Sequence, residues 1–464
     1  MQRINAIVSL TWKAAFRYRL FWVLALLLVG AVVGLPLLIK DDGTARGFTQ
    51  ILLTYTLSAI TALLGIATLW LACGTLARDI EDAQIQMVAV KPIARWQIWI
   101  GKWLGILSLN ALLLAMAGGS VYCLLQWRAN RLSPGQQMVL RNEVLVARAS
   151  VKEILPDFRE AVEAELQRRL QTARTGVSIN PTNISEIRKQ IEGQIKAGIQ
   201  SVRADGYRPW RIDLSHAKDS LRDQPLFLRV KFFTAQNNPS GTFIGLWQVG
   251  NPETKRVWRS EPMSLAPETF HEFPIPPNLL DENGILDVVF GNANQETLLF
   301  PLEDGLEVLY RESSFGVNFI RGLGIIFFWL ALLAALGLAA ASFLSFPVAA
   351  FVSLAVLMIG LSSGTLSSVV QEGTILGVDH ESGAKVSSSV LDLVMVPVFR
   401  AMLKIINLVQ NVSPIDSLST GRSITWTQLA LAGVQIVLFL GGILAAIGIY
   451  TFSRRELATA QGNS

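Results

Sequence analysis

Six apolar runs in this chain are each close to the length of a helix that crosses a lipid bilayer. The hydrocarbon core of a bilayer is about 30 Å thick, so a spanning helix needs roughly 20 apolar residues. The runs occupy residues 21–39, 51–73, 103–127, 323–343, 348–366 and 429–450. Hydrophobic residues make up 51% of the chain and charged residues 16%, which excludes an ordinary soluble globular protein. Six transmembrane helices are therefore predicted.

Positive residues at the outer ends of the first and last runs predict the side on which the termini lie. Lys13 and Arg17 precede the first run, and Arg454 and Arg455 follow the last. Lys and Arg are enriched at the cytoplasmic ends of transmembrane helices. Both termini are therefore predicted to be cytoplasmic, with residues 1–19 forming a short helix on the membrane surface.

A secretory signal peptide is the alternative for the N-terminal region. The apolar core 21–39 holds about 19 residues, longer than the roughly 7–15 of a signal peptide, and no small-residue cleavage pattern follows it. An uncleaved first transmembrane helix is the favoured interpretation.

Residues 128–316 contain no spanning run and are predicted to form an extracytoplasmic domain. Its first part, residues 136–205, is rich in Glu, Arg, Lys, Gln and Ala, and is predicted to be helical. The apolar residues Phe158, Val162, Leu166 and Leu170 follow heptad-like spacing there. This pattern favours a helical hairpin or stalk, and solvated surface helices without a partner are the alternative.

Residues 220–312 change to short, alternating, aromatic-rich runs. The runs are LFLRVKFF, TFIGLWQV, KRVWRS, FHEFPI, GILDVVFG, ETLLFPL and LEVLYR, with turns rich in Asn, Gly and Pro between them. The pattern predicts an antiparallel β-sandwich of about seven strands. Such sandwiches can bind sugars or proteins, but Trp247, Trp258 and Phe273 are expected in the core, because aromatic residues dominate cores. The predicted fold class is therefore an α-helical polytopic membrane protein with an α+β extracytoplasmic domain.

The membrane part is divided by this insert into residues 1–127 and 317–464. In the second half, the apolar stretch 388–410 is interrupted by Asp392, Pro397 and Arg400, and also by Lys404. These residues make a poor spanning helix, so a re-entrant or interfacial segment is predicted.

The segment 74–102, between the second and third predicted helices, is charged and broken by a proline. Its first half predicts a short amphipathic helix. Pro92 ends this helix and can open the next one, because it lacks an N–H. Trp96, Trp99 and Trp103 then fall on one helical face, where indole rings favour the membrane–water boundary. An ordinary basic, aromatic loop is the alternative.

Motifs for catalysis are missing from the sequence. It holds no G-x-x-x-x-G-K-[ST] phosphate loop and no H-E-x-x-H zinc motif. The three histidines are scattered, and Cys73 and Cys123 are expected near opposite membrane faces, too far apart to bridge. Asn110 is predicted to join helices, and Gly101 with Gly105 to permit close helix packing. We expect no enzyme activity, no metal, no cofactor and no nucleic-acid partner.

The order of residues in the segment resembles the coupling segment of ABC-2 type transporter permeases. The resemblance rests on Arg78-Asp79-Ile80-Glu81, Lys91-Pro92-Ile93-Ala94-Arg95 and Gly101-Lys102. The chain has Ala83-Gln84 where the family usually has Gly-Thr. The start ending Arg17-Tyr18-Arg19-Leu20-Phe21-Trp22, the turn 343–351 and the tail 414–455 also resemble the family, in its copper-processing and gliding-type branch. Residues 128–316 are not covered.

The resemblance implies the multi-pass membrane subunit of an ABC transporter in a bacterial inner (plasma) membrane. A separate ATPase subunit would bind the ATP and dock around residues 81–95, and two permease subunits, identical or different, would form the pathway. The implied ATPase-coupling residues are Asp79, Glu81, Lys91, Pro92, Arg95, Gly101 and Lys102.

Two further hypotheses follow from the size of the insert. In the first, ATP hydrolysis works the extracytoplasmic domain without any transport. In the second, the chain is a membrane-anchored protein whose sandwich binds a glycan or a protein.

Overall fold

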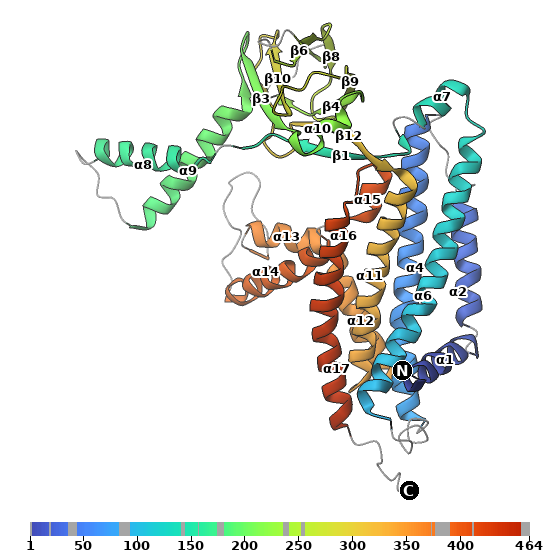
Figure 1. The fold of residues 1–464 in the computed structure, drawn as a ribbon. Helices are drawn as coiled ribbons and strands as arrows, with labels where there is room; N and C mark the ends of the chain where they lie inside the picture. Colours follow the sequence, from blue (N-terminus) through green and yellow to red (C-terminus); the bar gives the residue numbers. More distant parts are fainter. Residues whose placement is uncertain are drawn as a thin grey trace. The chain divides into compact units, whose positions relative to one another are not determined.

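The structure is a computed structural model of the 464-residue chain. It describes residues 2–17, 20–35, 44–82, 93–140, 144–155, 157–173, 181–234, 241–251, 256–372, 374–375, 390–410 and 413–455. The chain divides into two compact units (Figure 1). We call residues 1–147 with 313–464 the membrane unit, and residues 148–312 the sheet unit.

The membrane unit is helical throughout most of its described length. Its elements are α1 (Gln2–Arg17), α2 (Leu20–Val29), η1 (Gly30–Gly34), α4 (Ala45–Glu81), α6 (Arg95–Ala129), α7 (Pro134–Val139), α11 (Phe315–Ala341), α12 (Phe346–Leu361), α13 (Ser363–Glu372), α14 (Val390–Gln410), α15 (Pro414–Ser419), α16 (Trp426–Ala432), η5 (Gly433–Gly441) and α17 (Gly442–Arg454). Both η1 and η5 are π-helical, and α16, η5 and α17 form one continuous run that we call the last helix.

Within the described residues, four helices are long and apolar enough to cross a membrane: α4, α6, α11 and the last helix. A fifth candidate is the pair α12 and α13, which bends by 59° between Leu361 and Ser363. The first predicted helix, residues 21–39, is described only as far as residue 35, where α2 and η1 supply the short apolar helix Trp22–Gly34. The chain is thus a mostly helical protein with membrane-spanning candidates and a separate sheet region.

The helix limits differ from the predicted ones. The predicted second helix ends at residue 73 and is followed by a separate amphipathic helix, but α4 continues unbroken to Glu81. The predicted third helix begins at residue 103, but α6 already begins at Arg95. The apolar run marks only the stretch suited to lipid, while a helix can continue into water as long as its side chains allow.

The helices α4, α6 and α11 lie side by side and form the centre of the membrane unit (Figure 1). Leucine and isoleucine side chains of α4, among them Leu57 and Ile60, are completely buried between them. A Cβ on Gly337 of α11 would lie 2.7 Å from the Cβ of Ala72, so α4 and α11 approach closely at this point. Asn110 of α6 donates a hydrogen bond to the Thr68 hydroxyl of α4 at 2.8 Å, and thus contacts the neighbouring helix as the sequence predicts.

The helix α14 occupies the stretch predicted to be re-entrant or interfacial. It remains helical through Pro397 and packs against α13 (Figure 1). It is not one of the spanning candidates, because Asp392, Arg400 and Lys404 interrupt its apolar sequence. Several of its apolar side chains are exposed, among them Leu391 and Leu393.

The sheet unit contains two larger antiparallel sheets and one small one. Its strands are β1 (Val146–Lys152), β2 (Ser201–Val202), β3 (Tyr207–Asp213), β4 (Leu226–Val230), β5 (Phe233–Thr234), β6 (Phe243–Val249), β7 (Trp258–Arg259), β8 (Met263–Leu265), β9 (His271–Ile275), β10 (Ile285–Asn292), β11 (Leu298–Leu299) and β12 (Leu306–Ser314). The sheets have the orders β1-β12-β4-β9, β3-β10-β6-β7 with β8 beside β6, and β2-β11-β5. Its helical segments are α8 (Arg159–Ala173), α9 (Pro181–Gln200), η3 (Ser215–Ala217) and α10 (Lys218–Leu221).

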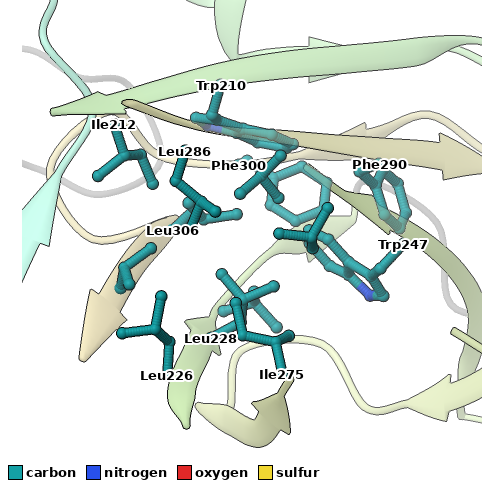
Figure 2. Close-up of a cluster of buried hydrophobic side chains, with 14 of the residues drawn as sticks. Trp210, Ile212, Leu226, Leu228, Trp247, Ile275, Leu286, Phe290, Phe300 and Leu306 are labelled. Atoms are coloured by element: carbon teal, nitrogen blue, oxygen red, sulfur yellow. The ribbon is translucent and has the colours of Figure 1, made fainter. Parts of the chain in front are cut away.

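The two larger sheets share one core, which Figure 2 shows in part. Alternate residues of β4 and β12, such as Leu228 and Leu306, face alternate residues of β6 and β10 across it. Trp247 is 2% exposed, and its ring centroid lies 4.8 Å from that of Phe290. Trp258 and Phe273 pack against the same core, stacked on one another. These aromatic residues are therefore packing residues, as expected from the sequence.

Each of the seven predicted runs contains a strand, but four of the described strands, β1, β2, β3 and β8, lie outside them. The strand β1 falls inside residues 136–205, and the prediction of helix is wrong there. Its apolar residues Ala149 and Val151 pack on the sandwich core, so tertiary pairing with β12 outweighs local composition. The strand β3 begins at Tyr207, before the predicted start of the sandwich at residue 220.

The helices α8 and α9 pack against each other in the region predicted to form a helical hairpin. Val162, Leu166 and Ile191 are buried between them. Arg188 of α9 forms a 2.8 Å ion pair with Glu163 of α8. The heptad-like apolar spacing therefore marks the contact between the two helices.

Candidate functional site

Five of the seven residues implied by the resemblance lie near one another, at one end of the membrane unit. They are Asp79 and Glu81 at the end of α4, and Arg95, Gly101 and Lys102 in the first turns of α6. The other two, Lys91 and Pro92, lie outside the described residues. We call the five residues, together with the helix ends that they contact, the helix-end cluster.

Lys102 joins α6 to α4 through a buried ion pair. Its Nζ lies 2.5 Å from Asp79 Oδ2 and also donates to the backbone oxygen of Thr75 at 2.7 Å. The Lys102 side chain is 8% exposed and that of Asp79 is 32% exposed. A buried ammonium must be paired to be tolerated, so Asp79 compensates the charge of Lys102 while remaining in reach of water.

Arg95 joins α6 to the end of α17. Its Nη1 donates to the backbone oxygens of Phe452, Ser453 and Arg455 at 2.9, 2.8 and 2.8 Å. The last carbonyl groups of a helix have no partner within the helix and carry partial negative charge, which a guanidinium satisfies well. The Arg95 side chain also lies over the ring of Phe452, which is completely buried.

Glu81 joins α4 to the beginning of α12. Its Oε1 accepts a hydrogen bond from the backbone N–H of Phe346 at 2.8 Å, at a helix N-terminus where a negative charge is favourable. The guanidinium of Arg78 lies 4.3 Å from the centre of the Phe346 ring. Arg455 extends the cluster, because its Nη1 donates to the backbone oxygen of Ser342 just after α11, at 3.3 Å.

Gly101 lies where α1 crosses α6. A Cβ on Gly101 would lie 2.8 Å from Ile7, and a Cβ on Gly105 would lie 2.7 Å from Thr11. The contact is extended by a 2.8 Å hydrogen bond from Trp12 Nε1 to the Ser108 hydroxyl. The predicted close packing at the two glycines therefore occurs, and its partner is α1.

A larger side chain at Gly105 is expected to displace α1. Gly105→Val puts a methyl group into the space that Thr11 occupies, and overpacking of this kind costs about 1–3 kcal/mol. The matched control is Gly119→Val on the same helix, because nothing lies within 4 Å of the Cβ position there. Thermal denaturation in detergent should show a lower midpoint for Gly105→Val only. Equal midpoints for the two variants would mean that α1 does not depend on this contact.

Of the tryptophans of α6, Trp99 is buried and Trp103 is partly buried against the core of the membrane unit. Trp99 is 1% exposed and packs on Gly448 of α17, where a Cβ would lie 2.8 Å from its Nε1. Trp103 donates to the backbone oxygen of Ala331 at 3.0 Å. The interfacial interpretation is wrong for Trp99, because a close approach of two helices buries its ring, whereas Trp96 is 48% exposed.

A second polar cluster lies at the beginning of α11 and was not predicted. Asn318 donates to the backbone oxygen of Arg422 and accepts from the N–H of Ile424. One turn later, Arg321 donates to the backbone oxygen of Ile424 at 2.8 Å and lies over the ring of Trp426. Both side chains are buried, and they fix the loop that precedes the last helix. The sequence signal for this cluster was an amide and a guanidinium at i and i+3 near the start of an apolar helix.

The sheet unit buries several charges outside its apolar core. Glu307 is 1% exposed and binds Arg229 at 3.2 Å and the Ser150 hydroxyl at 2.7 Å. Arg208 forms a 3.2 Å ion pair with Glu153. Burial raises the pKa of the Glu153 carboxyl and lowers the pKa of the Arg208 guanidinium, and their mutual attraction partly offsets both shifts.

Tyr310 and His216 form a polar contact at the edge of the apolar core, with 2.9 Å between the phenol oxygen and Nε2. Burial raises the pKa of the Tyr310 phenol, and the negative charge of Glu312 raises it further. No group of three His, Cys, Asp or Glu side chains in the described part of the chain is arranged to hold a metal ion.

Comparisons with protein-family models, with curated proteins and with solved structures find no match to this chain.

Proposed function

We propose that this chain is the permease subunit of an ABC transporter in a bacterial plasma membrane. A separate ATPase subunit docks on the segment between α4 and α6 and drives it. The chain itself needs no catalytic group or cofactor for this role, since ATP is bound and hydrolysed by the partner. The ordered resemblance of residues 78–102 to a coupling segment is the starting point of the proposal.

The single observation that carries the proposal is the way both ends of this segment are attached. On the α4 side, Glu81 holds the beginning of α12. On the α6 side, Arg95 holds the end of α17, and Lys102 ties the two sides together through Asp79. A displacement of the segment would therefore be transmitted to several helices of the membrane unit at once, which is the property that a coupling segment needs.

The charge distribution supports a cytoplasmic position for the helix-end cluster. Arg78, Arg95, Arg454 and Arg455 all lie at this end of the membrane unit. Cytoplasmic helix ends are enriched in such residues. The chain would cross the membrane six times, with α2 and η1 as the first crossing and the bent pair α12 and α13 as the fifth. Both termini would lie inside, and the insert, which follows the opposite end of α6, outside.

Two copies of the permease, or this chain and a related one, would form the complete membrane part. The substrate would be selected in the insert or between the two permeases. In such a transporter the ATPase would act by shifting the populations of the inward-facing and outward-facing conformations.

Purification of the tagged chain from its native membrane tests the proposal. A protein with a G-x-x-x-x-G-K-[ST] ATP-binding loop should co-purify. Lys91→Glu should lower its recovery by about tenfold, equivalent to about 1.4 kcal/mol of binding free energy. Lys13→Glu is the matched control, because Lys13 is an exposed basic residue of α1. Purification without any ATPase, in mild detergent and in lipid nanodiscs, would refute the proposal.

A further inference from the structure

The last helix is the least buried of the membrane-spanning candidates. In its most apolar 18-residue window, 17% of the residues are buried, compared with 50–56% for α4, α6 and α11. Leu438 and Phe439 in its middle are 70% and 56% exposed. The packing of the membrane unit therefore restrains this helix weakly over most of its length.

The middle of the last helix is also irregular. The nine residues Gly433–Gly441 are π-helical, a geometry that is rare and usually limited to a single turn. A π-helical stretch widens the backbone and interrupts the regular hydrogen-bond pattern, and it recurs at places where helices change their packing. The helix can thus adjust in its middle without losing its ends.

The two ends are held firmly by arginines from other helices. Arg321 and Asn318 of α11 hold residues 422–426 at the beginning. Arg95 of α6 holds the backbone oxygens at the end, next to the close contact between Gly448 and Trp99. A lightly packed helix that is anchored at both ends can move only as its anchors allow.

We propose that Arg95 is a positioning residue that makes the last helix follow the coupling segment, while Arg321 holds the opposite end as a pivot. This inference rests on the proposed function. Arg95 stands at the first position of α6, directly where the segment 83–94 enters the helix. Its three hydrogen bonds converge on one backbone end, so a displacement of Arg95 either carries α17 along or breaks all three bonds.

The inference assigns Arg95 to the interior of the chain rather than to the contact with the ATPase. All three oxygens lie within hydrogen-bond distance of one guanidinium nitrogen, Nη1, which the rigid planar group holds in place at the end of the side chain. Lysine keeps the charge and can reach some of these oxygens, whereas glutamine loses the charge. Arg, Lys and Gln at position 95 therefore give a contact with the end of α17 of decreasing strength. The amino-acid sequence of residues 83–92 stays the same in all three.

Spin labels can report the position of the end of the last helix. Met116 of α6 is 62% exposed, and Ser453 is exposed beside the Arg95 contact. Because 21 residues of helix separate position 95 from position 116, Met116→Cys and Ser453→Cys place labels roughly 30 Å apart, within range of pulsed electron resonance. The labelled chain carries Cys123→Ser, since Cys123 is exposed and Cys73 is buried.

The first arm uses the full chain in nanodiscs without nucleotide. Arg95→Gln should broaden the distance distribution, Arg95→Lys should give an intermediate width, and Arg454→Gln should leave it unchanged. Arg454 is the matched control because it is an exposed arginine at the same helix end. If the distance distribution of Arg95→Gln is as narrow as that of the labelled chain with Arg95, the inference is overturned.

The second arm adds the co-purified ATPase with and without ATP. The unmodified residue should show a nucleotide-dependent shift of the distance, and Arg95→Gln should lose this shift while retaining the ATPase. Loss of ATPase binding in Arg95→Gln, with the distribution still narrow, would make Arg95 a docking contact and overturn the inference. If no ATPase co-purifies with any variant, the proposed function fails, and the widths of the first arm alone decide whether Arg95 anchors the helix.

Discussion

Asp79→Asn is expected to destabilise the membrane unit strongly, by about 3–5 kcal/mol, because it leaves a buried ammonium without its counter-ion. The Lys102 side chain is 8% exposed, and after this substitution its Nζ would keep only uncharged acceptors, the backbone oxygen of Thr75 and the new amide oxygen. Asp79 itself is 32% exposed, so water can partly replace it and the lower part of the range is expected. The midpoint of thermal denaturation measures the effect, and it can be monitored by the loss of the monodisperse chromatographic peak after heating.

The double variant Asp79→Leu with Lys102→Met separates the charge from the packing. Replacement of both partners removes the unpaired ammonium, and buried ion pairs exchanged for apolar residues of similar volume are often neutral. The double variant should therefore be more stable than Asp79→Asn alone. Asp82→Asn is the control for loss of a negative charge at the exposed end of α4. A double variant as unstable as the single one would show that the shape of the contact matters, and not the charge.

Trp247→Ala is expected to destabilise the sheet unit by about 3–5 kcal/mol, the usual cost of removing a large aromatic side chain from a core. Trp247 is 2% exposed and contacts the rings of Phe290 and Phe300 (Figure 2). Trp247→Phe should cost much less, because the Trp247 indole N–H has no hydrogen-bond partner among the described residues and its loss is not penalised. Tyr207→Ala is the control for an aromatic residue outside the core, since Tyr207 is 76% exposed and should stay within about 0.5 kcal/mol.

Protease sensitivity of the full-length chain measures this effect without requiring reversible unfolding. Cleavage within residues 201–312 should accelerate in Trp247→Ala and remain slow in the other two variants. Rapid cleavage of Tyr207→Ala as well would assign a structural role to the outer face of the five-stranded sheet, and would contradict the assignment of the core.

Local pattern predicted the elements whose partners are close in the sequence or whose periodicity is strong. Most strands of residues 226–312 alternate clearly between apolar and polar residues, and all described strands there except the three-residue β8 contain residues of a predicted run. The strand β1 was missed because Ala147 and Ala149 alternate with polar residues too weakly to stand out among helix-favouring neighbours. Its conformation depends on β12, which lies more than 150 residues later in the chain.

In the candidate site, too, the sequence predicted some features and could not predict others. The residue order of the segment 74–102 singled out Asp79, Arg95 and Lys102 through its resemblance to a coupling segment, but their contact partners could not be found from the sequence pattern. Arg95 binds backbone oxygens more than 350 residues away, and a backbone oxygen has no residue-type signal. The predicted topology did contain a clue, because it places residues 74–102, 345–347 and 454–455 on one side of the membrane.

The way in which the insert joins the membrane helices makes it a separable module. Ser150 of β1 binds Glu307 of β12, and Lys152 binds the backbone oxygen of Glu303, so the two neighbouring strands run in opposite directions. The insert is thus entered and left at the same end of one strand pair, where neighbouring strands lie about 4.8 Å apart. Because the two ends of the insert lie so close together, inserting it between two helices costs little chain entropy. An ancestor with a simple turn between α6 and α11 could have acquired such a module, and could exchange it for another, without rebuilding its membrane helices.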